Sequence, residues 1–157
     1  MKVLCPVDCD NAPRKAILRD WTIAWAQGED SAAELLADDV VYEPAAGSLA
    51  EGKAAVVSYL SRPAAGVAEH AADRASGAAV DNNDDAVASG TVHSVPVELH
   101  IHHIITHGNT AALNATLLLD DGRRVDYCHI YLFNGFAKTA KLKRITAYRR
   151  SGNVTAP

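Results

Sequence analysis

Residues 35–60 read LLADDVVYEPAAGSLAEGKAAVVSYL, and this stretch decides the fold. The acidic pair at 38–39 is expected to end the segment before it. The β-branched and aromatic residues that follow predict a strand over 40–43, which ends at Pro44. Beyond a glycine-containing turn, apolar and helix-forming residues predict a short helix over 53–60.

Two helices are predicted upstream of this stretch. Apolar residues recur every three or four positions over residues 12–26, with Pro13 in the first turn, which is typical of an amphipathic helix. Ser31, followed by Glu34 three residues later, forms a capping-box pattern and predicts a second, shorter helix. The first third of the chain is therefore mainly helical.

Four strands are predicted in the second half of the chain, over residues 95–106, 111–119, 123–133 and 142–150. Short turns separate them, so they form an antiparallel meander. Residues 64–92 are rich in Ala, Gly, Asp and Asn and predict little beyond a short helix over 67–74. Helices first and strands last indicate an α+β fold.

Length and composition indicate one soluble globular domain. The chain has 157 residues, 48% of them hydrophobic, and 15 Lys and Arg against 19 Asp and Glu give a net charge of −4. We expect an N-terminal arm over 1–11, a single domain over 12–151 and a tail over 152–157. The acidic balance argues against nucleic acid as a partner, and no apolar run is long enough to span a membrane. With no signal-peptide pattern, we expect a cytoplasmic protein.

Possible metal ligands occur in two places. Cys5 and Cys9 could pair or bind a metal, but the cysteines are odd in number and we expect free thiols. Glu98, His100 and His102 alternate along one predicted strand, which can aim two imidazoles in the same direction, as in zinc sites. No further ligand pair lies nearby in the sequence, so we expect a polar strand face and no metal site.

The order of these elements resembles a known family. The run over residues 35–60 is similar to the F-A-D-D-x-x-x-x-D-P-x-G … G-x-x-x-I signature of the nuclear transport factor 2-like superfamily. Residues 122–135 (GRRVDYCHIYLFNG) and 142–150 (LKRITAYRR) extend the likeness. That superfamily includes ketosteroid isomerases, SnoaL-like polyketide cyclases and scytalone dehydratase. The resemblance implies a cystatin-like α+β barrel, in which a cone-shaped curved antiparallel sheet packs against N-terminal helices, and it implies a homodimer with an internal pocket.

The strand over 123–133 carries the first candidate site residues. Its alternation places Tyr127, His129 and Tyr131 on one face. The resemblance to ketosteroid isomerases places His129 where that family holds its oxyanion-stabilising acid, and an imidazole N–H can donate to a developing oxyanion. The alternative is that His129 is a core histidine bonded to one of the tyrosines.

Glu43 is the second candidate. The resemblance places it where the isomerases hold the carboxylate base that shuttles a proton, with EP standing in place of their DP. The alternative is a glutamate at the end of a strand that faces solvent. Trp21 takes the position of the isomerases' helix-1 tyrosine, and because an indole cannot act as an acid, it contributes an aromatic pocket wall instead.

A third candidate, His103, lies on an otherwise apolar face of its strand. It resembles in type and region the pocket histidine of scytalone dehydratase. A dehydratase or cyclase would then use His103 and His129 together with Tyr127 or Tyr131.

The last predicted strand is rich in basic residues. Its alternation directs Ile145, Ala147 and Arg149 toward the expected pocket, where basic side chains could attract an anionic ligand. The alternative is an edge strand whose Lys and Arg residues protect it from pairing with another chain.

These observations together predict a protein with a small-molecule pocket. If it is an enzyme, the resemblance implies an isomerase, cyclase or dehydratase acting on a hydrophobic cyclic or polyketide-like substrate, with Glu43 as base and His129 as donor. The alternative is a non-catalytic ligand-binding or dimerising module of the same fold. The sequence has no Gly-rich phosphate loop and no nucleophile motif, so we expect no cofactor.

Overall fold

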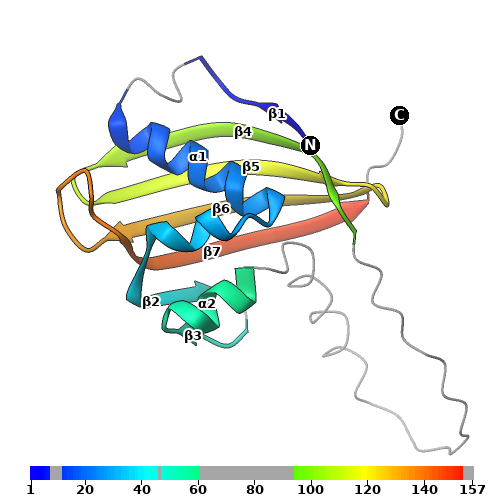
Figure 1. The fold of residues 1–157 in the computed structure, drawn as a ribbon. Coiled ribbons are helices and arrows are strands. Elements are labelled where there is room, and N and C mark those ends of the chain that lie inside the picture. Colours follow the sequence, from blue (N-terminus) through cyan, green and yellow to red (C-terminus); the bar gives the residue numbers. More distant parts are fainter. Residues whose placement is uncertain (8–11, 46, 61–93, 154–157) are drawn as a thin grey trace, which may run out of the picture.

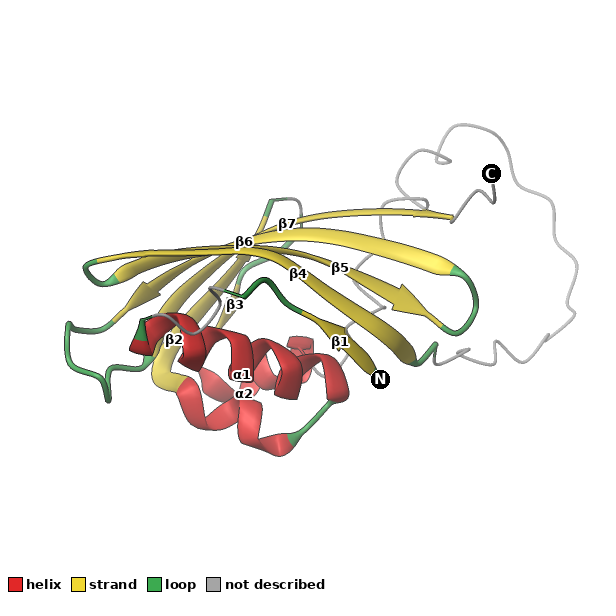
Figure 2. Cartoon of the chain, turned by 90° about the horizontal axis from the view of Figure 1, so that it is seen from above, coloured by secondary structure: helices red, strands yellow, loops and turns green. Residues whose placement is uncertain are grey.

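Two helices and a 3₁₀ helix lie on one side of a curved sheet (Figures 1 and 2). This computed structural model describes residues 1–7, 12–45, 47–60 and 94–153. The helical elements are α1 (Pro13–Gln27), η1 (Asp30–Leu35) and α2 (Lys53–Leu60). The strands are β1 (Lys2–Leu4), β2 (Leu36–Pro44), β3 (Ala50–Glu51), β4 (Pro96–His107), β5 (Thr110–Leu119), β6 (Arg123–Phe133) and β7 (Leu142–Asn153).

The seven strands follow the order β1-β4-β5-β6-β7-β2-β3. The meander from β4 to β7 is antiparallel, whereas β1 pairs in parallel with β4 and β2 in parallel with β7. The predicted α+β class and curved sheet are confirmed. Within the described residues the sheet is mixed and stays open, because β1 and β3 form its two unpaired ends rather than closing a barrel.

The inner face of the sheet, defined here as the side that faces the helices, carries the core. Along β6 the inner residues Val125, Tyr127, His129, Tyr131 and Phe133 are all buried, which confirms the predicted alternation. The opposite side, called the outer face, is more exposed and more polar. The two faces of one strand therefore have separate roles.

The amphipathic helix predicted over 12–26 is confirmed as α1. It buries Leu18, Trp21 and Trp25 against the sheet and ends at Gly28, whose φ of 71° suits the left-handed cap conformation. The predicted capping box does not form, because η1 begins one residue before Ser31 and has no side-chain cap hydrogen bond.

Strand β2 is longer than the sequence predicted. The acidic pair at 38–39 lies inside it, and the pairing with β7 shifts register between Leu36 and Val41. An irregularity of this kind lets two consecutive polar residues turn toward solvent while Leu36 and Val40 stay buried. The prediction that the acidic pair ends the preceding helix was therefore wrong, since η1 ends at Leu35 and the pair lies inside β2.

Strand β4 contains a second irregularity. Its pairing with β5 shifts register between Ile101 and His103. Beyond this bulge Ile104 is buried, whereas His103 and Ile105 are exposed. Strict alternation had assigned His103 and Ile105 to the inner face, and one extra residue reverses that assignment.

Strand β1 was not expected, since the sequence suggested only an N-terminal arm. It adds a short edge next to β4, with Lys2 opposite Glu98 and an ion pair of 3.0 Å between them. Cys5, just after β1, is disulfide-bonded, which corrects the expectation of a free thiol there. Cys128 is free and exposed on the outer face.

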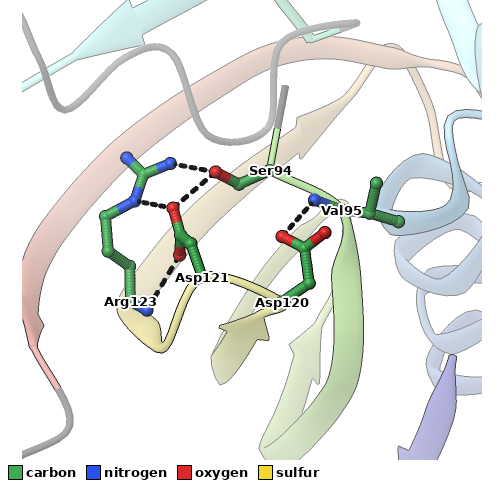
Figure 3. A network of polar contacts seen from close by, with 5 residues as sticks. All are labelled: Ser94, Val95, Asp120, Asp121 and Arg123. Carbon is green, nitrogen blue, oxygen red and sulfur yellow. Dashed lines mark hydrogen bonds and ion pairs between the residues drawn. The ribbon is translucent and has the colours of Figure 1, made fainter. Parts of the chain in front are cut away.

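The start of β4 is fastened to the turn between β5 and β6 by a polar network (Figure 3). Ser94 Oγ donates to Asp121 Oδ2, and the guanidinium of Arg123 donates to both of these atoms. The next carboxylate, on Asp120, accepts from the backbone N–H of Val95 at 2.9 Å. These contacts fix the residues just before β4 against the turn between β5 and β6.

The helix predicted over 67–74 lies outside the described residues. None of the helices in the described part of the chain is long and apolar enough to cross a membrane.

Candidate functional site

Three side chains from β6 form the centre of the candidate site on the inner face. His129 is completely buried, with Tyr127 and Tyr131 on either side of it along the strand. The ring centres of Tyr127 and His129 are 4.9 Å apart, and those of His129 and Tyr131 are 5.9 Å apart. The sequence-based grouping of these three residues is confirmed.

Helix α1 supplies an aromatic wall opposite these residues. Trp21 and Trp25 lie one helical turn apart and stack with ring centres 6.3 Å apart. Trp25 contacts Tyr127 edge-on at 5.3 Å, and Trp21 contacts Tyr131 edge-on at 5.6 Å. The prediction that Trp21 forms a wall agrees with this geometry, but Trp25 lies nearer to His129, at 5.8 Å.

Both indole N–H groups are already used. Trp21 Nε1 donates to the carbonyl of Ala32 at 2.8 Å, and Trp25 Nε1 donates to the carbonyl of Leu60 at 3.0 Å. These bonds tie α1 to η1 and to the end of α2. The two rings are therefore fixed in place as flat apolar surfaces.

Arg149 reaches the same face from β7. It lies directly opposite Tyr127 in the β6–β7 register. Its guanidinium carbon is 5.4 Å from the ring centre of Trp25 and 5.7 Å from that of Tyr42. Ile145 and Ala147, on the same strand, are buried and form an apolar floor, as the alternation predicted.

Several buried polar atoms around Arg149 have no hydrogen-bond partner within the described residues. They are the three guanidinium nitrogens of Arg149, the hydroxyls of Tyr42 and Tyr127, and Nε2 of His129. Buried polar groups are nearly always satisfied in native proteins, and an unsatisfied group calls for an unseen water, ion or ligand. These groups around Arg149 therefore define the candidate site.

Burial determines the protonation states of the site. It lowers the pKa of His129 well below its ordinary value, and the nearby Arg149 cation lowers it further. Burial likewise raises the pKa of Tyr42 to about 12 and raises the pKa of Tyr127 and Tyr131 above the ordinary value. The site therefore presents a neutral imidazole, protonated phenols and one cation at neutral pH.

His129 Nδ1 lies 3.3 Å from the hydroxyl of Tyr131. If the hydroxyl donates to Nδ1, the ring proton resides on Nε2, which then acts as a donor; in the other tautomer Nε2 is an acceptor. The unpartnered Nε2 can therefore hydrogen-bond a ligand in either sense. This contact also agrees in part with the alternative that His129 is a core histidine bonded to one of the tyrosines, because Nδ1 contacts Tyr131.

The structure does not bring Glu43 into this site. Its side chain is 43% exposed and pairs with Arg144 at 2.9 Å on the outer face. The preceding residue, Tyr42, is completely buried and occupies the inner position. The expectation that Glu43 faces the pocket was wrong by one residue, which in a strand reverses the face.

His103 is also absent from the site. The bulge in β4 turns it outward, where Nδ1 lies 3.1 Å from Asn114 Oδ1. The expected pairing of His103 with His129 therefore does not occur.

The neighbouring histidines form a polar outer face. The rings of His100 and His102 are 4.2 Å apart, and His102 Nε2 lies 2.8 Å from Thr116 Oγ1. Burial lowers the pKa of His102, and the nearby His100 adds to this effect. Within the described ranges, no three His, Cys, Asp or Glu side chains lie close enough together to hold a metal ion.

A cavity of about 120 Å³ lies beside the site, between α1, η1 and α2. Its walls include Trp25, Leu36, Val57 and Leu60, with Glu29 and Asp30 at one side. Trp25 is shared by this cavity and the polar cluster. None of the residues that carry the unpartnered polar atoms lines this cavity.

Sequence reasoning missed Tyr42 and Trp25. Both followed patterns that were visible in the sequence: Tyr42 alternates with Val40 in a predicted strand, and Trp25 falls four residues after Trp21 in a predicted helix. The resemblance directed attention to Glu43 instead. The burial pattern of β2 was the signal that would have identified Tyr42.

Solved structures share the fold of this chain. A protein of unknown function from Burkholderia xenovorans, described as NTF2-like, matches with a TM-score of 0.56 and 18% identity, over 96% of this chain and 91% of its own. The chain has the nuclear transport factor 2-like fold. This agrees with the resemblance found in the sequence, although no family model matches the chain and no curated protein matches it significantly.

Other proteins with the NTF2-like fold differ in origin and purpose. A candidate polyketide cyclase from Sinorhizobium meliloti matches with a TM-score of 0.50 and 16% identity, over 84% of this chain and 93% of its own. A de novo designed protein with a curved β-sheet matches with a TM-score of 0.56 and 13% identity, over 88% and 85%. At such low identity the likeness shows the NTF2-like fold alone, and function must be argued from the side chains.

Proposed function

We propose that this protein binds a small organic molecule on the inner face of its sheet and acts on it without a cofactor. The observation that carries the proposal is the cluster of buried, unpartnered polar groups around His129, Tyr127, Tyr42 and Arg149. Aromatic rings from α1 surround the same groups. Flat apolar walls with a few convergent polar atoms are typical of small-molecule sites.

The chemistry that the cluster supports is stabilisation of negative charge on oxygen. Tyr127 and Tyr42 keep their protons at neutral pH, and neutral His129 can donate from Nε2. Hydrogen-bond donors that are already in place, in a site shielded from water, stabilise a developing oxyanion strongly. An isomerase, cyclase or dehydratase acting on a hydrophobic cyclic or polyketide-like substrate passes through such an anion.

The central group of this proposal is His129, because Glu43 faces solvent. Its Nε2–H donates to the ligand oxygen when the Tyr131 hydroxyl donates to Nδ1, and burial beside the Arg149 cation keeps the imidazole neutral. Among the described side chains that contact His129, there is no carboxylate to act as a base. The enzyme proposed here therefore differs from the Asp- or Glu-based scheme that the sequence resemblance implied.

A ligand titration followed by NMR tests this proposal. The His129 ring resonances should shift on saturation with hydrophobic cyclic ketones or polyketide-like aromatics. The His103 ring, on the outer face, serves as the internal control and should not shift. If the His129 signals stay unchanged across both compound classes while the protein remains folded, the proposed inner-face site is wrong.

A second candidate function is association through the outer face. Ile130 and Tyr148 are 41% and 49% exposed there, beside a groove of about 420 Å³ lined by His102, Thr116, Asp126 and Cys128. Exposed apolar side chains on one side of a sheet are typical of a protein interface. We propose a homodimer in which this face meets its copy.

Sedimentation velocity tests whether the outer face forms a homodimer interface or stays exposed in a monomer. The wild-type chain should sediment as a dimer, and Ile130→Glu should sediment as a monomer because two charges would meet at the interface. Leu49→Glu, an exposed substitution elsewhere, is the matched control. A wild-type monomer at high concentration would contradict the dimer proposal and leave the ligand proposal intact.

A further inference from the structure

Arg149 has a buried cationic group with no compensating acid in the described part of the chain. All three guanidinium nitrogens are shielded from solvent and lack a hydrogen-bond partner there. A guanidinium carries five N–H donors in a planar fork, and leaving them unpaired inside a protein is strongly unfavourable. A buried guanidinium of this kind calls for a partner with hydrogen-bond acceptors, and an anionic group satisfies both its donors and its charge.

The carboxylates nearest in the sheet register are engaged elsewhere. Asp126, opposite Arg150, forms an ion pair with Arg124 at 2.8 Å. Glu43 pairs with Arg144 at 2.9 Å. Both carboxylates lie on the outer face, so neither neutralises the Arg149 guanidinium on the inner face.

The surroundings of Arg149 define the shape of what can bind. The guanidinium lies within 6 Å of the rings of Trp25 and Tyr42, at 5.4 and 5.7 Å from their centres. These contacts hold the fork in place and attract it electrostatically. The hydroxyls of Tyr42 and Tyr127 and Nε2 of His129 are the other unpartnered groups.

We propose that the ligand of the inner-face site is an organic carboxylate whose carboxyl group is received by Arg149. A guanidinium binds a carboxylate through two parallel hydrogen bonds, and this geometry suits Arg better than Lys. The phenol hydroxyls of Tyr42 and Tyr127 donate to the same anion or to a second oxygen of the ligand. The apolar part of the ligand packs against Trp25. This inference rests on the proposed function and names the substrate class for the same site.

Pairs of a carboxylate and the corresponding amide test directly whether the site recognises the negative charge of the ligand. Acetate, benzoate and 2-naphthoate are compared with acetamide, benzamide and 2-naphthamide by calorimetry at constant ionic strength. Because each pair has almost the same size and shape, only charge recognition separates its members. At least one carboxylate should bind about tenfold or more tightly than its amide, a ratio typical of a charge-assisted pair.

Three variants assign the effect to Arg149. Arg149→Gln should abolish the preference for the carboxylate, and Arg149→Lys should keep part of it because the charge stays while the fork is lost. Arg150→Gln removes the same charge from the exposed neighbour on the outer face and should keep the preference unchanged.

Stability of the free protein separates a binding role from a structural one. Since Arg149→Gln removes a buried unpaired cation, the ligand-free Tm should stay equal or rise. A lower Tm together with lost binding would instead indicate a structural arginine and overturn the inference.

Binding of both members of each pair with equal affinity would also overturn the inference, yet the proposed small-molecule site would stand. Saturable binding of none of the six compounds would contradict the carboxylate ligand, and the NMR titration of His129 with neutral compounds would then decide the proposed function separately.

Discussion

Glu43 and Arg144 form an ion pair of 2.9 Å on the outer face of the sheet, one residue away from the completely buried Tyr42. Adjacent residues of a strand point to opposite faces, so Glu43 faces solvent and Tyr42 faces the core. The residue that resembled a catalytic base is therefore a surface group, and the residue before it belongs to the site.

The exposed position of Glu43 predicts that its carboxylate is dispensable. Glu43→Gln should change the free energy of unfolding by less than about 1 kcal/mol, because surface ion pairs contribute little. Ligand binding and any turnover should be retained. Denaturant unfolding and calorimetry measure both effects, with Tyr42→Phe as the contrasting variant that alters the inner site. A large loss of activity in Glu43→Gln would show that the carboxylate reaches the ligand.

The burial of His129 should make the free energy of unfolding depend on pH. Its folded pKa lies well below the unfolded value of about 6.5, so below that pH the unfolded chain binds a proton that the folded chain does not. Stability should therefore be full above about pH 6.5 and fall as the pH decreases toward the folded pKa, by at most ~1.4 kcal/mol per pH unit. Arg149 on β7 and the Tyr42 phenol on β2 face the same ring.

Urea unfolding at several pH values between 7 and 5 measures this dependence. His129→Gln should flatten the curve relative to the wild type, whereas His103→Gln, on the exposed side of β4, should leave it steep. Equal slopes for the wild type and His129→Gln would mean that His129 accepts a proton in the folded state.

The two tryptophans should report ligand binding unequally. Trp25 lies 5.4 Å from the Arg149 guanidinium and borders the cavity, whereas Trp21 packs on Tyr131. A ligand bound near Arg149 should change the tryptophan fluorescence of Trp21→Phe, in which Trp25 is the sole tryptophan. The change should be small in Trp25→Phe.

Trp25→Phe should also lower stability, by about 1–3 kcal/mol, because the buried carbonyl of Leu60 loses its donor. Thermal melting of both variants verifies that each remains folded before the titration. An equal fluorescence response in the two variants would place the ligand away from Trp25.

The lowered pKa of Asp121 should make the stability of the fold depend on pH in a second, more acidic range. Hydrogen bonds from Ser94 and from the backbone of Arg123 lower its pKa to about 2 (Figure 3). A carboxyl group with a lowered folded pKa stabilises the fold above its unfolded pKa of about 4, and this contribution is lost as the pH falls toward 2. Asp121→Asn should therefore reduce the loss of stability between pH 4 and pH 2.

Ser94→Ala provides a graded comparison, since it removes the first of these hydrogen bonds and keeps the carboxylate. Because the folded pKa of Asp121 would then lie closer to its unfolded value, the loss of stability between pH 4 and pH 2 should be smaller than in the wild type and larger than in Asp121→Asn. An unchanged acid limb in both variants would show that the network in Figure 3 does not hold Asp121 ionised.

Much of the architecture followed from local sequence patterns. The bounds of β6 and α2, the amphipathic character of α1 and the grouping of Tyr127, His129 and Tyr131 on one face were all predicted correctly. These features depend on short-range periodicity, which the chain carries in its own residues.

The two errors had different causes. The bulge in β4, a register shift against β5, turned His103 outward. Glu43 was chosen from the family resemblance, although alternation with Val40 already favoured Tyr42 for the inner face. A bulge or a shifted strand start moves every following side chain to the other face, and local composition barely records it.

The sequence by itself determined the α+β class, the likeness to the nuclear transport factor 2-like fold and the central histidine. Alternation along the last strand already directed Arg149 toward the inner face. Only the tertiary structure decided that its guanidinium is buried without a hydrogen-bond partner among the described residues. Its guanidinium packs near Trp25 of α1 and Tyr42 of β2, two rings from different elements that only the folded chain brings to the same arginine.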